Sequence, residues 1–331
     1  MDFSYSFVIV SWNAREHLLA CLESLLSDPV GREGEIIVVD NASSDGSPQA
    51  VARCFPQVKL ILNKQNLGFA AATNQGLEES SGKYVFLINS DVIVLPGCLE
   101  ALIGCFEAER RAGLLGPRLL NPDRSLQPSC MIFPSLRSVL CRTFALDKLF
   151  PKTLWSASLF LPLSLHDRTR EVDGLSGAFW AVRREALREV GLLDEGFFMY
   201  GEDIDWCRRF HRCGWRVIYC AEAEAIHVGG ASSANAPLRF ARELVRANLR
   251  YWRKHHGLGP TALVWLLALI GHASRALGRG LLSLVVWNRA GQLRKRAFRS
   301  LALVGFLLTG LPRAPKRPAT SRHLALQEAG G

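Results

Sequence analysis

The densest group of acidic side chains in the chain lies between Gly191 and Arg209. Five acids fall within twelve residues there: Asp194, Glu195, Glu202, Asp203 and Asp205. Four aromatic residues are interleaved with them and could line a pocket for an acceptor molecule: Phe197, Phe198, Tyr200 and Trp206. A partly desolvated carboxylate has a raised pKa and is a better general base. We therefore predict a proton-transfer site here, and spacing alone leaves Glu202, Asp203 and Asp205 as candidates.

Two opposite influences act on this acid run. Glu202 and Asp203 stand just before a predicted helix, whose N-terminal dipole stabilises ionised carboxylates and lowers their pKa. Burial among aromatic rings raises the pKa. The sequence therefore does not assign a pKa to either group.

Asp91 follows the apolar run Phe86–Ile88, directly after Asn89 and Ser90. Hard cations such as Mg²⁺ or Mn²⁺ take oxygen ligands of this kind and commonly bridge to substrate phosphates. Such an ion would offset the negative charge on a departing phosphate group. A helix-capping aspartate is the alternative interpretation.

Two further segments suit a nucleotide. Asp40 and Asn41 end the apolar run Ile36–Val39, where a carboxylate can accept hydrogen bonds from a uracil or thymine imide or from a ribose hydroxyl. Gly68, two residues after Asn66, lets the backbone approach a ligand closely. The helix predicted to begin next contains Asn74, and its N-terminus would favour a pyrophosphate. Capped-loop chemistry and helix packing explain both segments equally well.

Short apolar strands are predicted to carry these polar residues. The runs at 7–10, 36–39, 59–62 and 84–88 alternate with helical patterns, which predicts an α/β fold with a mostly parallel sheet covered on both faces. Further strands are predicted at 177–182 and 216–220, with a long, partly helical excursion over 121–170. Ligands bind beyond the carboxyl ends of such strands. The following residues are expected at those ends: Asn13, Asp40, Asn41, Asn63 and Asp91.

Composition places the chain among globular proteins, with 49% hydrophobic and 21% charged residues in 331. No Cys-x-x-Cys pair occurs among its nine cysteines, so free thiols in a reducing compartment are expected. The N-terminus runs directly into a strand pattern, so no signal peptide is expected. These features favour a location in the cytoplasm or peripherally attached on the cytoplasmic side of a membrane.

The net charge of +10 is concentrated toward the end of the chain. From Pro237 onward, 17 basic residues face two acidic ones, Glu243 and Glu328. Apolar blocks at 263–270, 281–287 and 301–308 alternate with Arg and Lys clusters, and none reaches the roughly 18 apolar residues of a spanning helix. We expect amphipathic helices on an anionic membrane surface. A packed helical subdomain and a hairpin that dips into the bilayer are the alternatives.

These features divide the chain into a catalytic domain over 1–257, a membrane-associating helical segment over 258–311 and a disordered tail over 312–331. No helix-turn-helix, zinc or RNP-like signature appears, so no nucleic-acid partner is expected.

The order of the motifs, taken together, resembles family 2 glycosyltransferases of the GT-A fold. The motifs are the strand followed by Asp40-Asn41, Asn66-Leu67-Gly68-Phe69, Asn89-Ser90-Asp91, Ser176-Gly177-Ala178 and Glu202-Asp203. The similarity covers about residues 6–257 and is greatest to the bacterial branch of rhamnosyltransferases.

The resemblance implies roles for single residues. Asp40 would contact the nucleotide base, Asp91 would be the second acid of the family's Asp-x-Asp metal motif, and Asp203 would activate the acceptor hydroxyl. His227 matches a position that can contact metal or pyrophosphate, and Asp173 lies in a loop that faces the donor sugar or the acceptor. Asn89 departs from the pattern because it replaces the first acid, which leaves one carboxylate for the metal.

The implied reaction is an inverting transfer of rhamnose or another hexose from a dTDP- or UDP-linked donor. A glycan or polyprenyl-linked glycolipid of the cell envelope would accept the sugar. A catalytically inactive sugar-nucleotide binder or membrane scaffold is one alternative. A nucleotidyltransferase is another, although its usual Gly-rich loop with Arg and Lys is missing from the N-terminus.

Overall fold

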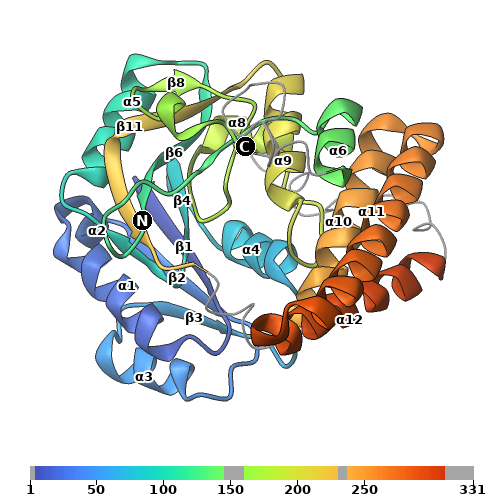
Figure 1. The fold of residues 1–331 in the computed structure, drawn as a ribbon. Helices are drawn as coiled ribbons and strands as arrows, with labels where there is room; N and C mark the ends of the chain where they lie inside the picture. Colours follow the sequence, from blue (N-terminus) through green and yellow to red (C-terminus); the bar gives the residue numbers. More distant parts are fainter. Residues whose placement is uncertain (1–3, 145–159, 230–236, 310–331) are drawn as a thin grey trace.

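The computed structural model describes residues 4–144, 160–229 and 237–309. Within these ranges a curled sheet of nine strands is flanked by helices on both faces (Figure 1). Eight strands follow the order β3-β2-β1-β4-β10-β6-β11-β5, and β8 (Arg170–Glu171) pairs with β11. All nine cysteines are free thiols, as the sequence predicts.

The N-terminal half of the sheet is parallel. Its strands are β1 (Tyr5–Ser11), β2 (Glu35–Asp40), β3 (Lys59–Leu62) and β4 (Tyr84–Asn89). The helices between them are α1 (Arg15–Ser27), α2 (Pro29–Glu33), α3 (Ser47–Cys54) and α4 (Phe69–Glu78). All four predicted apolar runs are strands in the structure. Strands β1, β2 and β4 are buried on both faces, which is typical of continuous apolar runs.

The C-terminal half of the sheet is mixed. Strand β10 (Phe179–Arg183) runs antiparallel to both β4 and β6 (Ala112–Leu120). Strand β11 (Arg216–His227) is parallel to β6 and antiparallel to β5 (Val92–Val94). β11 is much longer than the predicted strand at 216–220, and its extension carries His227 to the same edge of the sheet as Asp91.

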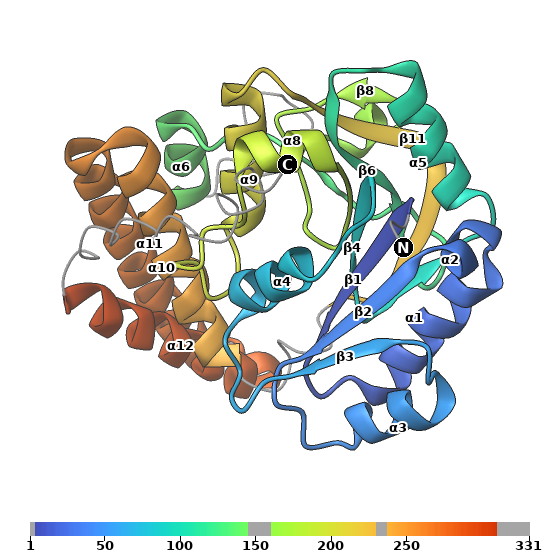
Figure 2. The same cartoon turned by 180° about the vertical axis from the view of Figure 1, so that it is seen from behind.

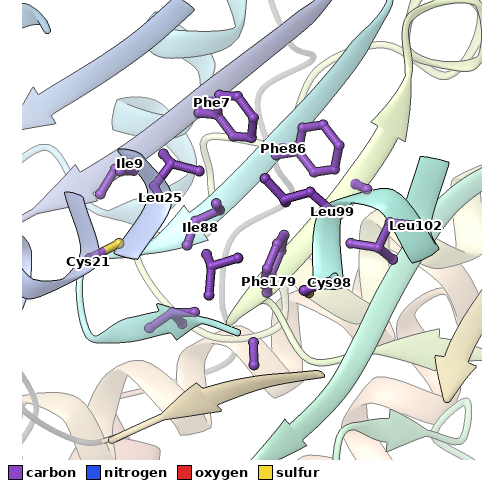
Figure 3. Close-up of a cluster of buried hydrophobic side chains, with 14 of the residues drawn as sticks. Phe7, Ile9, Cys21, Leu25, Phe86, Ile88, Cys98, Leu99, Leu102 and Phe179 are labelled. Carbon is purple, nitrogen blue, oxygen red and sulfur yellow. The ribbon is translucent and has the colours of Figure 1, made fainter. Parts of the chain in front are cut away.

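Two apolar layers hold helices against this sheet. On one face, Phe7 and Phe86 stack with ring centroids 4.9 Å apart and contact the buried faces of α1 and of α5 (Cys98–Ala108) (Figure 3). On the other face, Trp180 and Trp206 join α9 (Glu202–Arg212) and α8 (Arg184–Val190) to the strands. Helix α9, which begins with the predicted catalytic acids, is therefore fixed by buried aromatic packing.

The excursion over 121–170 contains the short strand β7 (Cys130–Met131), paired with β9 (Gly174–Leu175). Helix α6 (Leu136–Thr143) and the 3₁₀ turn η1 (Leu163–Leu165) supply its helical part. Residues 145–159 lie outside the described residues.

Three long helices follow the sheet domain: α10 (Pro237–His256), α11 (Leu258–Val285) and α12 (Ala290–Leu308), with the turn η3 (Trp287–Arg289) before α12. They gather on one side of the molecule beside α6 (Figures 1 and 2). Gly257, with φ of +82°, separates α10 from α11. The predicted disordered tail at 312–331 lies outside the described residues.

Helix α11 differs from the sequence prediction. Two apolar blocks that were expected to be separate belong to one continuous helix of 28 residues. By length and composition alone this helix is long and apolar enough to cross a membrane. Gly271, Arg275 and Arg279 interrupt the apolar sequence without interrupting the helix.

Candidate active site

A pocket of about 260 Å³ opens at the carboxyl ends of β1 and β4. Ten of the predicted site residues line it together: Asn41, Asn66, Gly68, Ser90, Asp91, Phe198, Tyr200, Glu202, Asp203 and His227. The structure thus brings the predicted donor, metal, base and acceptor residues to one cavity.

One wall of the pocket is a hydrogen-bonded turn around Gly68. The Asn41 side chain donates to Asn66 Oδ1 (3.2 Å) and to the Gly68 carbonyl (3.1 Å). Gly68 has φ of +90°, and a Cβ there would lie 2.4 Å from the Phe198 carbonyl oxygen. The Phe69 N–H donates to that same carbonyl at 2.7 Å. Glycine is therefore required, because the turn holds the aromatic loop of Phe198 against the start of α4.

Asp40 lies beside this wall at the end of β2 but does not line the pocket. Its Oδ2 accepts the Ser43 N–H at 2.8 Å, whereas the buried Oδ1 has no partner among the described residues. A buried carboxylate oxygen normally accepts a hydrogen bond, so this atom suits a donor supplied by a ligand. Asn13, with φ of +51°, accepts from the Ser44 N–H and shapes the adjoining turn without lining the pocket.

Asp91 and His227 meet on the opposite wall. His227 Nε2 lies 3.4 Å from Asp91 Oδ1, and Asp91 Oδ2 accepts the Gly229 N–H at 3.1 Å. Burial disfavours ionisation of Asp91, but the contacts with His227 and Gly229 outweigh it and hold the pKa of the carboxyl below its usual value. Gln127 Oε1 lies 2.7 Å from His227 Nδ1 and orients the ring.

This pair fits a divalent cation that also binds phosphate oxygens. Asp91 offers an ionised carboxylate and His227 a ring nitrogen, with Ser90 and Asn89 lining the same cavity. No group of three or more His, Cys, Asp or Glu side chains with metal-site geometry occurs in the described part of the chain. Substrate oxygens and water would complete such a site, as is usual for Mg²⁺.

Glu202 and Asp203 begin α9 at the floor of the pocket. Burial is the largest influence on both carboxyls; repulsion from Asp203 adds to it at Glu202, and repulsion from Asp205 adds to it at Asp203. The pKa of Asp203 rises to about 6, and that of Glu202 rises well above its usual value. Asp203 accepts the Ile204 N–H at 2.8 Å, while Glu202 Oε2 is buried without a partner among the described residues. Glu202 therefore favours its protonated form more strongly than Asp203, whose ionised form keeps a backbone hydrogen bond.

Asp205 and Trp206 do not line the pocket, so their prediction as acceptor residues needs correction. Asp205 is fully buried and lies 2.7 Å from His255 Nε2 and 2.8 Å from Lys254 Nζ. Burial raises the pKa of Asp205, but the hydrogen bond with His255 and the charges of Lys254 and Arg209 outweigh it and lower the value to about 2. Trp206 packs on Trp180 in the core. Both residues thus anchor α9 inside the protein and do not line the pocket.

Asn74 and Asp173 also lie outside the pocket lining. The Asn74 amide donates to the Leu193 carbonyl and to Glu195 Oε1, and it accepts the Leu193 N–H, each at 3.0 Å. Asp173 Oδ2 accepts the Phe133 N–H at 2.9 Å. Asn74 therefore ties α4 to the loop before α9, and Asp173 fixes the excursion that contains β7.

Several lining residues were not among the predicted site residues: Trp12, Ser176, Met199, Arg239 and Phe240. Trp12 follows β1 at a predicted strand end, and Ser176 belongs to the Ser-Gly-Ala motif, so both had a signal. Arg239 and Phe240 come from the first turn of α10, and the Arg239 guanidinium lies 4.9 Å from the Phe198 ring centroid. No local motif marks them, because they reach the pocket only through the packing of α10 on the sheet domain.

The comparisons with known proteins agree with this arrangement. The model of the family "Glycosyl transferase family 2" matches residues 6–191. An N-acetylglucosaminyl-diphospho-decaprenol L-rhamnosyltransferase of Mycobacterium tuberculosis is 34% identical over 241 residues, covering 70% of this chain and 78% of that protein. A low-salt glycan biosynthesis hexosyltransferase of Haloferax volcanii is 24% identical over 231 residues, with 67% and 66% covered.

Solved structures share the fold at low sequence identity. A mannosyltransferase of Pyrobaculum calidifontis, solved with GDP-mannose and Mn²⁺, superimposes with a TM-score of 0.55 at 15% identity, covering 92% of this chain and 87% of that one. S. aureus TarS residues 1–349 with UDP gives a TM-score of 0.50 at 13% identity, covering 91% and 89%.

The half-parallel sheet and the pocket at its strand ends define a GT-A type glycosyltransferase. The chain belongs to glycosyl transferase family 2.

Proposed function

We propose that this glycosyltransferase carries out an inverting transfer from a nucleoside diphosphate sugar to a lipid-linked acceptor in cell-envelope synthesis. The observation that carries the proposal is the pocket in which the Glu202–Asp203 pair lies together with Asp91 and His227. The Glu202–Asp203 pair suits a general base. Asp91 and His227 suit a site for the departing diphosphate.

Asp203 is assigned the role of general base. The acceptor hydroxyl gives its proton to the Asp203 carboxylate as its oxygen bonds to C1 of the donor sugar. The bond from C1 to the diphosphate breaks on the opposite face, so the anomeric configuration inverts. A carboxyl with a pKa of about 6 is mostly ionised at pH 7 and is a stronger base than an ordinary aspartate.

The donor occupies the strand-end side of the pocket. Asp40 Oδ1 is assigned to accept a hydrogen bond from the nucleotide base or the ribose. The turn around Asn66 and Gly68 forms the wall against which the donor lies. Mg²⁺ or Mn²⁺, held by Asp91 with His227, would offset the negative charge of the leaving diphosphate. Arg239 adds a positive charge at the mouth of the same pocket.

The mycobacterial relative supports a proposal for the donor sugar and the acceptor class. The mycobacterial relative is named for transfer of L-rhamnose to N-acetylglucosaminyl-diphospho-decaprenol, which favours a dTDP-linked donor and a polyprenyl-diphosphate sugar as acceptor. Such an acceptor lies in a membrane, and the helices α11 and α12 expose large apolar side chains. We therefore place the enzyme at the cytoplasmic surface of a membrane, peripherally attached.

A titration of nucleotide sugars tests the donor assignment. Calorimetry with dTDP-rhamnose, UDP-glucose and GDP-mannose, each with and without Mn²⁺, should show metal-enhanced binding of at least one donor. Asp91→Asn should weaken metal-dependent binding at least ~10-fold, about 1.4 kcal/mol. Asp167→Asn, which removes an exposed carboxylate outside the pocket, is the matched control and should bind normally. Failure of every donor to bind under both conditions would remove the proposal.

A further inference from the structure

A second cavity, of about 380 Å³, lies within the C-terminal helices and shares no lining residue with the active-site pocket. Its walls come from α6, α10, α11 and α12, which lie together on one side of the molecule (Figure 2). Its basic lining residues are His272, Arg275, Arg279 and Arg299.

Among the residues that the structure describes, no carboxylate lines this cavity. Glu243 is the only acid in α10, α11 and α12, and it forms an ion pair with Arg246 outside the cavity. Arg279 donates to Ser300 Oγ (3.0 Å) and to the Arg296 carbonyl (3.4 Å), which orients its guanidinium without neutralising it. Like charges gathered in one cavity repel each other, so an anion bound there would be stabilised. The planar guanidinium group of arginine can donate two parallel hydrogen bonds to the oxygens of a phosphate group.

The rest of the cavity is apolar. Leu249, Val264 and Leu303 are among the side chains that line it. A site for inorganic phosphate alone needs no apolar wall of this kind. The combination of guanidinium groups and aliphatic side chains suits an amphiphile with a phosphate head.

The outer faces of α11 and α12 are apolar as well. On α11 the exposed large side chains recur at helical spacing: Leu263, Leu266, Ile270, Leu277, Leu281 and Leu284. Phe298, Leu301 and Leu308 do the same on α12. These faces would contact acyl chains while the cavity holds the head.

We propose that the cavity between α6, α10, α11 and α12 binds the phosphate headgroup of an anionic membrane phospholipid. Arg279 and Arg299 contact the phosphate, and the apolar wall contacts the first methylenes of the acyl chains. The helical layer then recognises a particular lipid group in addition to lying on a negatively charged surface. This inference goes beyond the proposed sugar transfer and does not depend on it.

The test uses soluble probes and the full-length protein. Dihexanoyl phosphatidic acid, kept below its micellar concentration, offers phosphate and acyl chains together. Inorganic phosphate offers the anion alone, and dihexanoylglycerol offers the chains alone. Calorimetry should show saturable binding of the phosphatidic acid at least ~10-fold tighter than that of either other probe, about 1.4 kcal/mol.

Charge-matched variants locate the binding. Arg279→Gln with Arg299→Gln should weaken binding of dihexanoyl phosphatidic acid at least ~10-fold. Arg294→Gln with Lys295→Gln removes the same charge from exposed positions of α12 outside the cavity, and binding should stay within about twofold. Arg299→Gln alone, an exposed position, keeps the comparison valid if loss of the Arg279 hydrogen bonds lowers the melting temperature.

Each contrary result overturns the proposal in its own way. Equal affinity for inorganic phosphate would show an anion site only, and equal affinity for dihexanoylglycerol would show an apolar groove only. Equal loss in the two double variants would show general charge attraction. Titrating a nucleotide sugar into the same variants separates this site from the active site, because donor affinity should be unchanged in all of them.

Discussion

At the residue scale, adjacent carboxyls at the start of α9 are given different roles by their surroundings. Glu202 is buried without a partner and favours its protonated form, whereas Asp203 accepts a backbone hydrogen bond and ionises at about pH 6. The helix N-terminus lowers the pKa of these carboxyls and burial among aromatic rings raises it, as the sequence indicates. Burial is the larger effect. Asp203 is therefore the member of the pair that ionises in the pH range where a base is needed.

The pH dependence of transfer follows from this pair. Because Asp203 must be ionised to act as a base, kcat/KM should fall about tenfold for each pH unit below about 6. Glu202 favours its protonated form over this range, so Glu202→Gln removes no negative charge and should leave the acid limb in place. A rate profile measured from pH 4.5 to 8 checks both statements. An acid limb that moves to lower pH in the variant would show an ionised Glu202 beside Asp203 and would contradict this account.

The sequence identified most of the pocket because residues at strand ends and in short loops carry local motifs. It misplaced Asp205 because acids close together in sequence need not share a helix face. Asp203 and Asp205 are two residues apart on α9 and so point about 200° apart around its axis. The position of Arg239 was not predictable, because it depends on how a distant helix packs.

At the element scale, α10 fixes the helix that carries the base. Lys254 bridges Asp205 and Asp194, His255 contacts Asp205, and Arg250 contacts Asp194 at 2.6 Å. Asp205 lies on α9 and Asp194 lies in the loop before it, and all the partners named here lie on α10. In the sequence, the basic residues at the end of α10 belong to a basic tail. In the structure, several of them instead contact the acids Asp194 and Asp205.

Removing Asp205 should loosen that attachment. Asp205→Asn leaves buried cations without a counter-charge and should lower the free energy of unfolding by about 3–5 kcal/mol. Asp203→Asn, the same chemical change two residues away, is the matched control and should not destabilise, because the Asp203 carboxyl is disfavoured as an ion. Urea denaturation at pH 7 measures both, and equal stabilities of the two variants would contradict the role of the cluster.

The same cluster predicts an acid transition. The pKa of Asp205 is lowered to about 2 from an ordinary value of 3.8, so its ionised form stabilises the folded state. That stabilisation is complete above about pH 4 and is lost as the pH falls through about 2. The melting temperature of the wild type should therefore fall over this range more steeply than that of Asp205→Asn.

At the scale of the whole molecule, the sheet domain and the C-terminal helices share one apolar core. Phe197 and Ile204 of the sheet domain pack in the same cluster as Trp252 of α10, Val264 of α11 and Leu307 of α12. Cutting the chain after Gly257 would expose part of this cluster, so truncation does not give a clean test of membrane binding. The sequence predicts the three apolar blocks but not their packing, because contacts distant in sequence join them to the sheet domain.

Substitutions on the outer face of α11 give the cleaner test. Leu281 and Leu284 are 58% and 64% exposed, so Leu281→Glu with Leu284→Glu should leave the melting temperature nearly unchanged. Placing two charges in the proposed lipid-facing surface should reduce flotation with phosphatidylglycerol vesicles at least ~10-fold. Leu62→Glu, at a 61% exposed position on β3, is the control and should float normally. Unchanged flotation of the double variant would exclude α11 from the membrane contact.

The central claim is acceptor-dependent sugar transfer with Asp203 as the base. Its most direct measurement is the release of nucleoside diphosphate from dTDP-rhamnose in the presence of Mn²⁺ and a short-chain polyprenyl-diphosphate N-acetylglucosamine. The account predicts release that requires the acceptor, falls at least ~10³-fold in Asp203→Asn and leaves donor affinity within about threefold in that variant. Full activity of Asp203→Asn would contradict the assignment of Asp203 as the base. No acceptor-dependent release from this or any other nucleotide sugar would contradict the account as a whole.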